Sequence, residues 1–118
     1  MRSTLLFFFI APSAAPVSLQ GHNKSSTSIF VTWGPVPLSE QNGVILNYTV
    51  SYKEASHGSA KTVTVDEPTN STTLKDLNKY TNYSITVFAS TIKGGGIVSA
   101  PIFVITDQDS KFVIYRIH

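Results

Sequence analysis

The sequence predicts an all-β domain, a sandwich of two packed antiparallel sheets with about seven short strands. Apolar residues recur with a period of two between residues 17 and 106, and Gly, Pro, Asn and Ser separate these runs. The sequence shows no stripe of apolar residues at helical spacing. With 118 residues, of which 42% are hydrophobic and 14% charged, the chain suffices for one domain with a filled core but not for two.

The first three strands follow from alternation and from proline. A short strand is expected at residues 17–20. In residues 28–33 every second side chain is apolar, and Pro35 ends the strand because proline cannot donate to a ladder. In residues 46–53 apolar and polar side chains alternate, with Leu46 on the apolar face, which predicts a sheet with one solvated face.

The remaining strands follow from the same alternation. Residues 61–66 and 71–74 lie on either side of a polar turn. Residues 82–90 place apolar side chains on one face, and three glycines that begin at Gly94 open a loop before the last strand, residues 102–106. We expect four large side chains to anchor the core: Trp33, Tyr48, Leu77 and Tyr83.

Residues 77–89 read Leu-x-x-x-Thr-x-Tyr-x-Ile-x-Val-x-Ala. Together with Trp33 in the second strand, Tyr48 in the third and the proline-bearing segment before the domain, they resemble the fibronectin type III family, an immunoglobulin-like β-sandwich, over most of the chain. The resemblance implies that the Tyr83 hydroxyl returns to the backbone just upstream. It also implies that the glycine loop joins the last two strands, where some relatives carry an Arg-Gly-Asp integrin motif that this chain lacks.

Three segments are expected along the chain: a signal-like or linker segment at 1–15, the domain at 16–107 and a tail at 108–118. Arg2 and the apolar run that follows are typical of a secretory signal, although an artefactual N-terminus joined to an interdomain linker would look the same. The run is too short to span a bilayer, so no membrane span is expected in this chain, though a parent chain could have one.

Composition excludes several classes of function. Residues 16–108 contain six lysines and six carboxylates, so the segment has no excess of positive charge and we expect no basic patch for nucleic acid. The chain has no cysteine, and His22, His57 and His118 are scattered, so we expect neither a metal site nor a cofactor. Ser56, His57 and Asp66 lack the surroundings of a catalytic triad, and we expect no enzyme activity.

Two kinds of surface site are candidates. Four sequons predict N-glycosylation: Asn23, Asn47, Asn70 and Asn82. Asn47 and Asn82 alternate with inward tyrosines and should face solvent, whereas Asn23 and Asn70 are expected in polar turns. A loop at one end of the sandwich is the candidate contact for an unidentified protein partner: Lys93, Gly94, Gly95, Gly96 and Ile97.

Outer aromatic side chains leave one question open. Phe30, Phe88 and Phe103, with Ile105, fall on the faces that should be solvated, and they could form an apolar patch or stand singly. The function that agrees with these observations is a non-catalytic extracellular interaction or spacer module of an adhesion or signalling receptor, found outside the cell or at its surface. The alternative is an intracellular structural repeat of the muscle-filament kind, in which the sequons would be unused.

Overall fold

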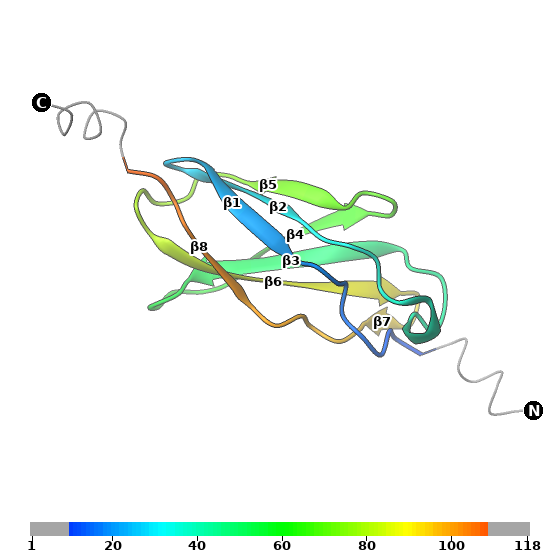
Figure 1. The fold of residues 1–118 in the computed structure, drawn as a ribbon. Coiled ribbons are helices and arrows are strands. Elements are labelled where there is room, and N and C mark those ends of the chain that lie inside the picture. The colour runs from blue at the N-terminus through cyan, green and yellow to red at the C-terminus, as the bar shows by residue number, and fades with distance from the viewer. Residues whose placement is uncertain (1–9, 109–118) are drawn as a thin grey trace, which may run out of the picture.

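The computed structural model describes residues 10–108 and confirms an all-β sandwich of two antiparallel sheets (Figure 1). Its elements are β1 (Gln20–Ser25), β2 (Ser28–Thr32), the 3-10 turn η1 (Leu38–Glu40), β3 (Asn47–Glu54), β4 (Lys61–Asp66), β5 (Ser71–Leu74), β6 (Asn82–Thr91), β7 (Gly94–Gly95) and β8 (Ile102–Ile105). One sheet has the order β1-β2-β5, and the other has the order β4-β3-β6-β7 with β8 also paired to β6.

The last strand of the sandwich is split into β7 and β8. β7 pairs with Ser90 and Thr91 at one end of β6, and β8 pairs with residues 82–85 at the other. Between them, the Gly96 and Ser99 amides still donate to carbonyls of β6, at 2.8 and 2.9 Å. The two segments therefore act as one interrupted edge strand, which reconciles them with the seven strands that were predicted.

The prediction of the first strand was wrong. It begins at Gln20 and runs to Ser25, where residues 17–20 were expected. The alternation is hidden because the inward position next to Val31 is a glycine, Gly21. A Cβ atom at Gly21 would lie 3.2 Å from both Ile102 Cδ1 and Val104 Cγ2, so glycine allows β1 to approach β8 closely.

Leu46 was expected on the core face but is 47% exposed. Its amide donates to the Ser90 carbonyl at 2.8 Å, while its carbonyl accepts from the Glu67 amide at 3.0 Å. In a regular strand the N–H and C=O of one residue point to the same side. Because Leu46 bonds to strands on opposite sides, its backbone is irregular and β3 begins one residue later.

The core lies between the sheets and consists of the alternate side chains of their inner faces. Ile29, Val50, Leu74, Ile85 and Val87 have no exposed surface. The full burial of each such side chain stabilises the fold by about 1.5–3 kcal/mol. The core also holds the four residues expected to anchor it, each less than a tenth exposed: Trp33, Tyr48, Leu77 and Tyr83.

A polar network closes the sandwich around the start of β6. The Asn78 amide donates to the Tyr83 hydroxyl at 2.8 Å, which is the return to upstream backbone that the resemblance implied. The buried Thr106 hydroxyl donates to the Asn78 carbonyl at 2.7 Å and accepts from the Thr81 amide at 2.9 Å. The sequence predicts Thr106 only as the end of a strand, because nothing in the sequence indicates the bonding partners of a threonine hydroxyl.

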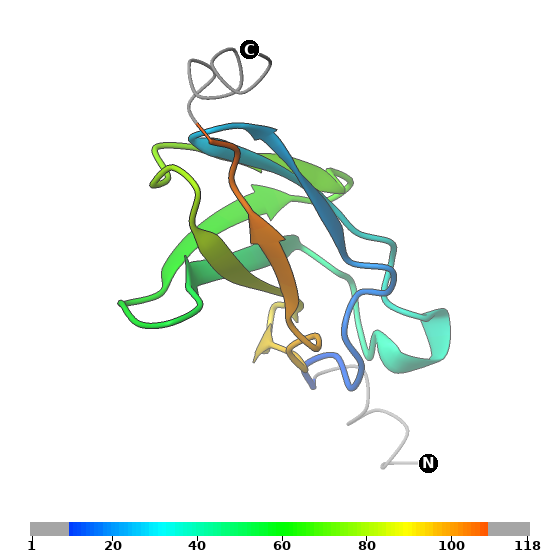
Figure 2. The same cartoon turned by 60° about the vertical axis from the view of Figure 1, so that its left-hand side comes forward.

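The two long sides of the sandwich differ. On one side β8 lies beside β1 (Figure 2). There the Asn23 side-chain amide donates to the Ile105 carbonyl at 3.0 Å, and the Asp107 amide donates to the Ser25 carbonyl at 3.3 Å. On the other side, β4 and β5 are the outer strands of their sheets and pair with no further strand among residues 10–108.

Candidate functional site

The glycine loop is shaped by close packing. Ile92 and Lys93 form the turn after β6, and Gly94 has a φ of +122°, which side chains rarely adopt. A Cβ atom at Gly95 would lie 2.6 Å from a ring carbon of Phe88. The glycines are therefore required by the fold itself, and the loop exposes the apolar side chains on either side of them.

The start of the chain packs against this loop. A Cβ atom at Gly96 would lie 2.5 Å from the Pro12 carbonyl oxygen. The Thr91 hydroxyl donates to the Ile10 carbonyl at 3.3 Å, and the Asn42 side-chain amide donates to the Ala11 carbonyl at 3.1 Å. Residues 10–13 thus join the glycine loop to the loop that contains η1.

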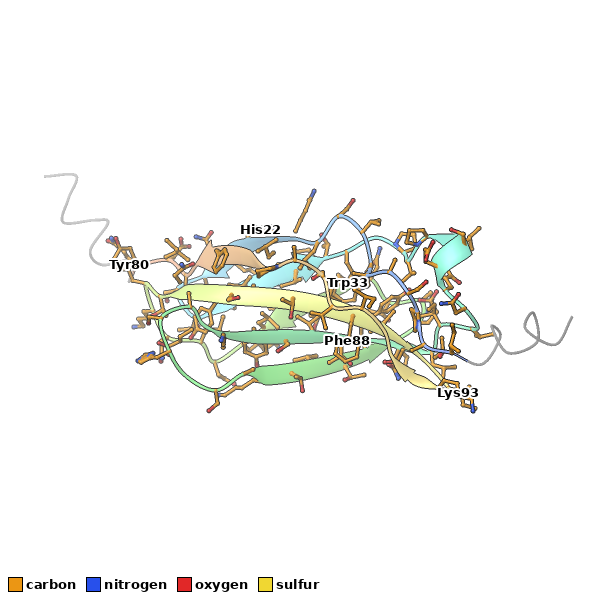
Figure 3. The ribbon with its side chains drawn as sticks, turned by 90° about the horizontal axis from the view of Figure 1, so that it is seen from below. His22, Trp33, Tyr80, Phe88 and Lys93 are labelled. Carbon is orange, nitrogen blue, oxygen red and sulfur yellow. The ribbon has the colours of Figure 1, made fainter. Side chains whose placement is uncertain are left out.

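These contacts define an end surface. It consists of residues 10–13, the loop between β2 and β3 that contains η1, and residues 92–97. It lies at the opposite end of the sandwich from Tyr80, and Lys93 marks it in Figure 3. Its apolar side chains are highly exposed, with 87% of Leu38, 76% of Val44 and 82% of Ile92 open to solvent. All five residues of the predicted contact loop, Lys93 to Ile97, belong to this surface.

The four sequons lie in different settings. Asn47 and Asn82 are the first residues of β3 and β6, and both alternate with inward tyrosines, so they lie on the outer face of the larger sheet. Asn82 is exposed and Asn47 is half-buried. The register of β3 with β6 separates them by eight residue steps, about 26 Å along the sheet.

The other two sequons lie in a turn that leads into the smaller sheet and in a strand of that sheet. Asn70 is exposed in the turn between β4 and β5, as expected for a polar turn. Asn23 was expected in a turn as well, but it lies in β1, and its side-chain nitrogen already donates to the Ile105 carbonyl. The prediction failed because a strand made of polar residues resembles a turn in sequence.

The outer aromatic side chains do not form one patch. His22 lies against Phe30, with ring centroids 5.5 Å apart, and the Lys24 ammonium is 6.0 Å from the centre of the Phe30 ring. Phe88 packs on Gly95. Phe103 and Ile105 remain 60% and 50% exposed on β8.

Of the three residues considered for catalysis, Ser56 and His57 are neighbours, whereas Asp66 lies far from both. The His57 ring Nδ1 is 3.5 Å from the Ser56 hydroxyl and 3.9 Å from Glu54 Oε1. Asp66 pairs with Asn47, at the far end of β3 from Glu54. No group of three metal-ligating side chains occurs in the part of the chain that the structure describes.

Burial alters one ionisable group. Desolvation, with the hydrogen bond and the negative charge of Glu67, raises the pKa of the Tyr48 hydroxyl. The Tyr48 ring also packs against Trp33, with ring centroids 5.7 Å apart. This tyrosine is therefore a neutral core residue that ties the start of β3 to the turn before Pro68.

A polar cleft of about 280 Å³ lies at the end of the sandwich near Tyr83. Its lining includes Lys53, Glu54, Lys61 and Asp76. Charges of both signs line it, and the Asn78 side-chain amide donates to Glu54 at 2.5 Å, so the cleft selects neither cations nor anions. We assign it no ligand.

Among residues 10–108, no helix has the length and apolar character needed to cross a membrane.

Comparison with known proteins decides the family. The sequence profile described as "Fibronectin type III domain" matches residues 14–105. The chain belongs to the fibronectin type III domain family. This confirms the resemblance drawn from Trp33, Tyr48 and residues 77–89.

Several curated relatives contain a similar fibronectin type III domain. Protein sidekick-1 of Gallus gallus is 41% identical over 101 residues, which cover 83% of this chain and 5% of that protein. Phosphatidylinositol phosphatase PTPRQ of Homo sapiens is 37% identical over 99 residues, covering 84% and 4%. Receptor-type tyrosine-protein phosphatase F of Mus musculus is 36% identical over 101 residues, covering 83% and 5%. The chain thus spans about a twentieth of these relatives, and receptor proteins carry domains of this type.

Solved structures of fibronectin type III domains share the fold. A crystal structure of the chicken CNTN1 FN1-FN3 domains matches with a TM-score of 0.76 and 30% identity, covering 84% of this chain and 33% of that one. The FN5 domain of Drosophila Lar matches with a TM-score of 0.69 and 29% identity, covering 84% and 100%. A solution structure of the third fibronectin III domain of human KIAA0343 protein has a TM-score of 0.79, covers 86% and 87%, and, at 24% identity, supports the fold alone.

Proposed function

We propose that this domain is a non-catalytic extracellular module that binds proteins and sets spacing within an adhesion or signalling receptor. The observation that carries the proposal is the match of four-fifths of the chain to a small part of much longer proteins, one of them named a receptor. A domain that repeats within such proteins contributes surfaces and length, while any catalytic activity belongs to other domains.

The end surface is the proposed contact for a protein partner. Its loops are held by the sandwich, and they expose three large apolar side chains, Leu38, Val44 and Ile92. Exposed apolar side chains that gather on one surface typically mark an interaction site. The loop from Lys93 to Ile97 is part of this surface, and Ile92 and Ile97 are exposed on it, so partner binding is expected to depend on these two side chains.

Glycans are proposed to limit which faces partners can reach. Asn82 and Asn70 are exposed, and a glycan at either position would project into solvent. A glycan at Asn47 would stand at the other end of the outer face from Asn82. Asn23 is the least favourable site, because its side-chain nitrogen bridges the two sheets.

Secretion tests the extracellular assignment. The full chain is expressed in a secreting eukaryotic cell, and the product in the medium is analysed by N-terminal sequencing and by mass before and after glycosidase treatment. We expect a secreted product that loses mass on treatment and starts between residues 13 and 17. Such a start would leave the mature domain without residues 10–12, so its end surface would then consist of the loop around η1 and residues 92–97. Asn82→Gln and Asn70→Gln should each remove part of that loss, whereas Asn78→Gln, which changes an asparagine outside any sequon, should not.

An intracellular product that keeps Met1 and carries no glycan would contradict the extracellular assignment. The signal-like residues 1–9 lie outside the described residues, so this experiment is also the test of that prediction. The domain division at residues 15 and 107 stays a prediction too, and the sequenced N-terminus tests its first boundary.

A further inference from the structure

The strand β4 presents an open edge. It pairs with β3 from Tyr52↔Lys61 to Asn47↔Asp66 and with no other strand among residues 10–108. Four of its six residues are exposed, namely Lys61, Thr62, Thr64 and Asp66. Neither proline nor a bulge interrupts it, and its charged side chains, which also protect edges, stand at its two ends and leave residues 62–65 uncharged.

The hydrogen-bond register shows which backbone groups of β4 point outward. The Ala55 amide donates to the Asn82 carbonyl, so the odd-numbered residues of β3 bond to β6. The even-numbered residues of β3 therefore bond to β4. The bond from the Glu67 amide to the carbonyl of Leu46, an even-numbered residue just before β3, fits this pattern. Lys61, Val63 and Val65 consequently face β3, and the N–H and C=O groups of Thr62, Thr64 and Asp66 face the free edge.

The side chains of β4 suit a second copy of the same strand. Lys61 lies at one end, and Asp66 and Glu67 lie at the other. A parallel copy would place like charges together. An antiparallel copy centred on Thr64 places Lys61 opposite Glu67 of the second copy, and it pairs each outward-facing residue with another outward-facing residue.

The same register matches the two faces of the sheet. Thr62 then lies opposite Asp66 of the second copy on the outer face, and Val63 lies opposite Val65 on the inner face. Both valines pack against the core but are only partly buried. Directly opposed side chains in an antiparallel pair lie about 4.5–5.5 Å apart, so the valines of the two copies would cover each other.

We propose that two copies of this chain associate through β4, in an antiparallel pair centred on Thr64, to form one continuous sheet across both molecules. This inference rests on the proposed function as an interaction module and names one of its surfaces and partners. The contact is one strand wide and falls below the size of a standard stable interface, so the association is weak and concentration-dependent.

Self-association is measured on the chain expressed in bacteria, which attach no N-glycan. Sedimentation velocity runs from about 10 µM to about 1 mM, a range that covers weak complexes. We expect the average mass to rise toward that of a dimer. In NMR spectra over the same range, the amides of Thr62, Thr64 and Asp66 should shift most, whereas the amides of the end surface should not.

Two variants form a matched pair. Thr64→Pro removes the central outward donor without removing a bond to β3, and it should weaken self-association at least about tenfold. It also removes the Thr64 hydroxyl, which lies 3.1 Å from that of Thr49. Thr49→Ala removes the same hydroxyl pair but keeps the edge donor, so it should associate like the parent. Unchanged circular dichroism shows that each variant is folded.

A third variant does not depend on proline. Lys61→Glu places like charges at both ends of the antiparallel pair and should also abolish the rise in mass. A parent chain that remains monomeric at the highest concentration overturns the proposal, as does association that survives in both Thr64→Pro and Lys61→Glu. Because the test uses bacterial protein, either result leaves the assignment of the domain to the extracellular space untouched.

Discussion

The hydrogen bond from the Asn78 amide to the Tyr83 hydroxyl provides the sharpest test of the fold. Tyr83→Phe keeps the buried ring and removes only the oxygen, so the Asn78 amide loses its acceptor in a partly buried position. An unsatisfied donor of this kind costs about 1–3 kcal/mol. For a domain of this size each kcal/mol corresponds to a drop of about 4–8 °C in Tm.

The assay is urea denaturation followed by Trp33 fluorescence. The free energy of unfolding should fall while the m-value stays constant, because the mutation does not change the surface exposed on unfolding. Tyr80→Phe is the control: Tyr80 is 67% exposed, and its loss of a hydroxyl should change the free energy by less than about 0.5 kcal/mol. If Tyr83→Phe behaves like that control, the bond does not stabilise the native state.

Three other changes test separate features of the fold. Gly96→Ala should destabilise the domain by about 1–3 kcal/mol in the same assay, because its Cβ would meet the Pro12 carbonyl; Ser59→Ala, at an exposed position, is the comparison. Thr106→Val should cost about 1–3 kcal/mol, since it leaves the polar groups around Asn78 without their shared partner; a stability equal to the parent would rule this out. The raised pKa of Tyr48 means that the unfolded chain loses this proton first, so its stabilising contribution is present below pH 10.0 and declines as the pH rises further. Unfolding measured from pH 8 to 11 should show this decline, and Tyr48→Phe should show a shallower one.

The core could be predicted from sequence because inward and outward side chains alternate along each central strand. Ile29, Val31 and Trp33 share one face, and all three are buried. The edge strands could not be predicted so well. β1 is polar and uses Gly21 for its inner contact, and β7 consists of two glycines. At such positions the strand is fixed by contacts with distant residues, and local sequence carries no trace of them.

Only part of the end surface could be predicted from the sequence. Three consecutive glycines located the loop at the end of the sandwich correctly. The role of Leu38, Val44 and residues 10–13 in that surface was missed, because they meet the loop only through tertiary contacts such as Asn42 to Ala11. The exposed position of Asn82 followed from its alternation with Tyr83, whereas the bridging role of Asn23 required the position of β8.

The anchoring of residues 10–13 has a mechanical consequence. Their backbone is held by Asn42 and Thr91, and the Ser13 amide donates to the Glu40 carbonyl at 2.9 Å. Each ordered residue gives up about 1–2 kcal/mol of backbone conformational entropy, which these bonds and the buried Pro12 ring offset. Residues 10–13 are therefore not a free hinge in front of the first strand. A pull on the N-terminal side reaches the sandwich through two loops at once, so tension along the chain loads the whole end surface before it loads β1.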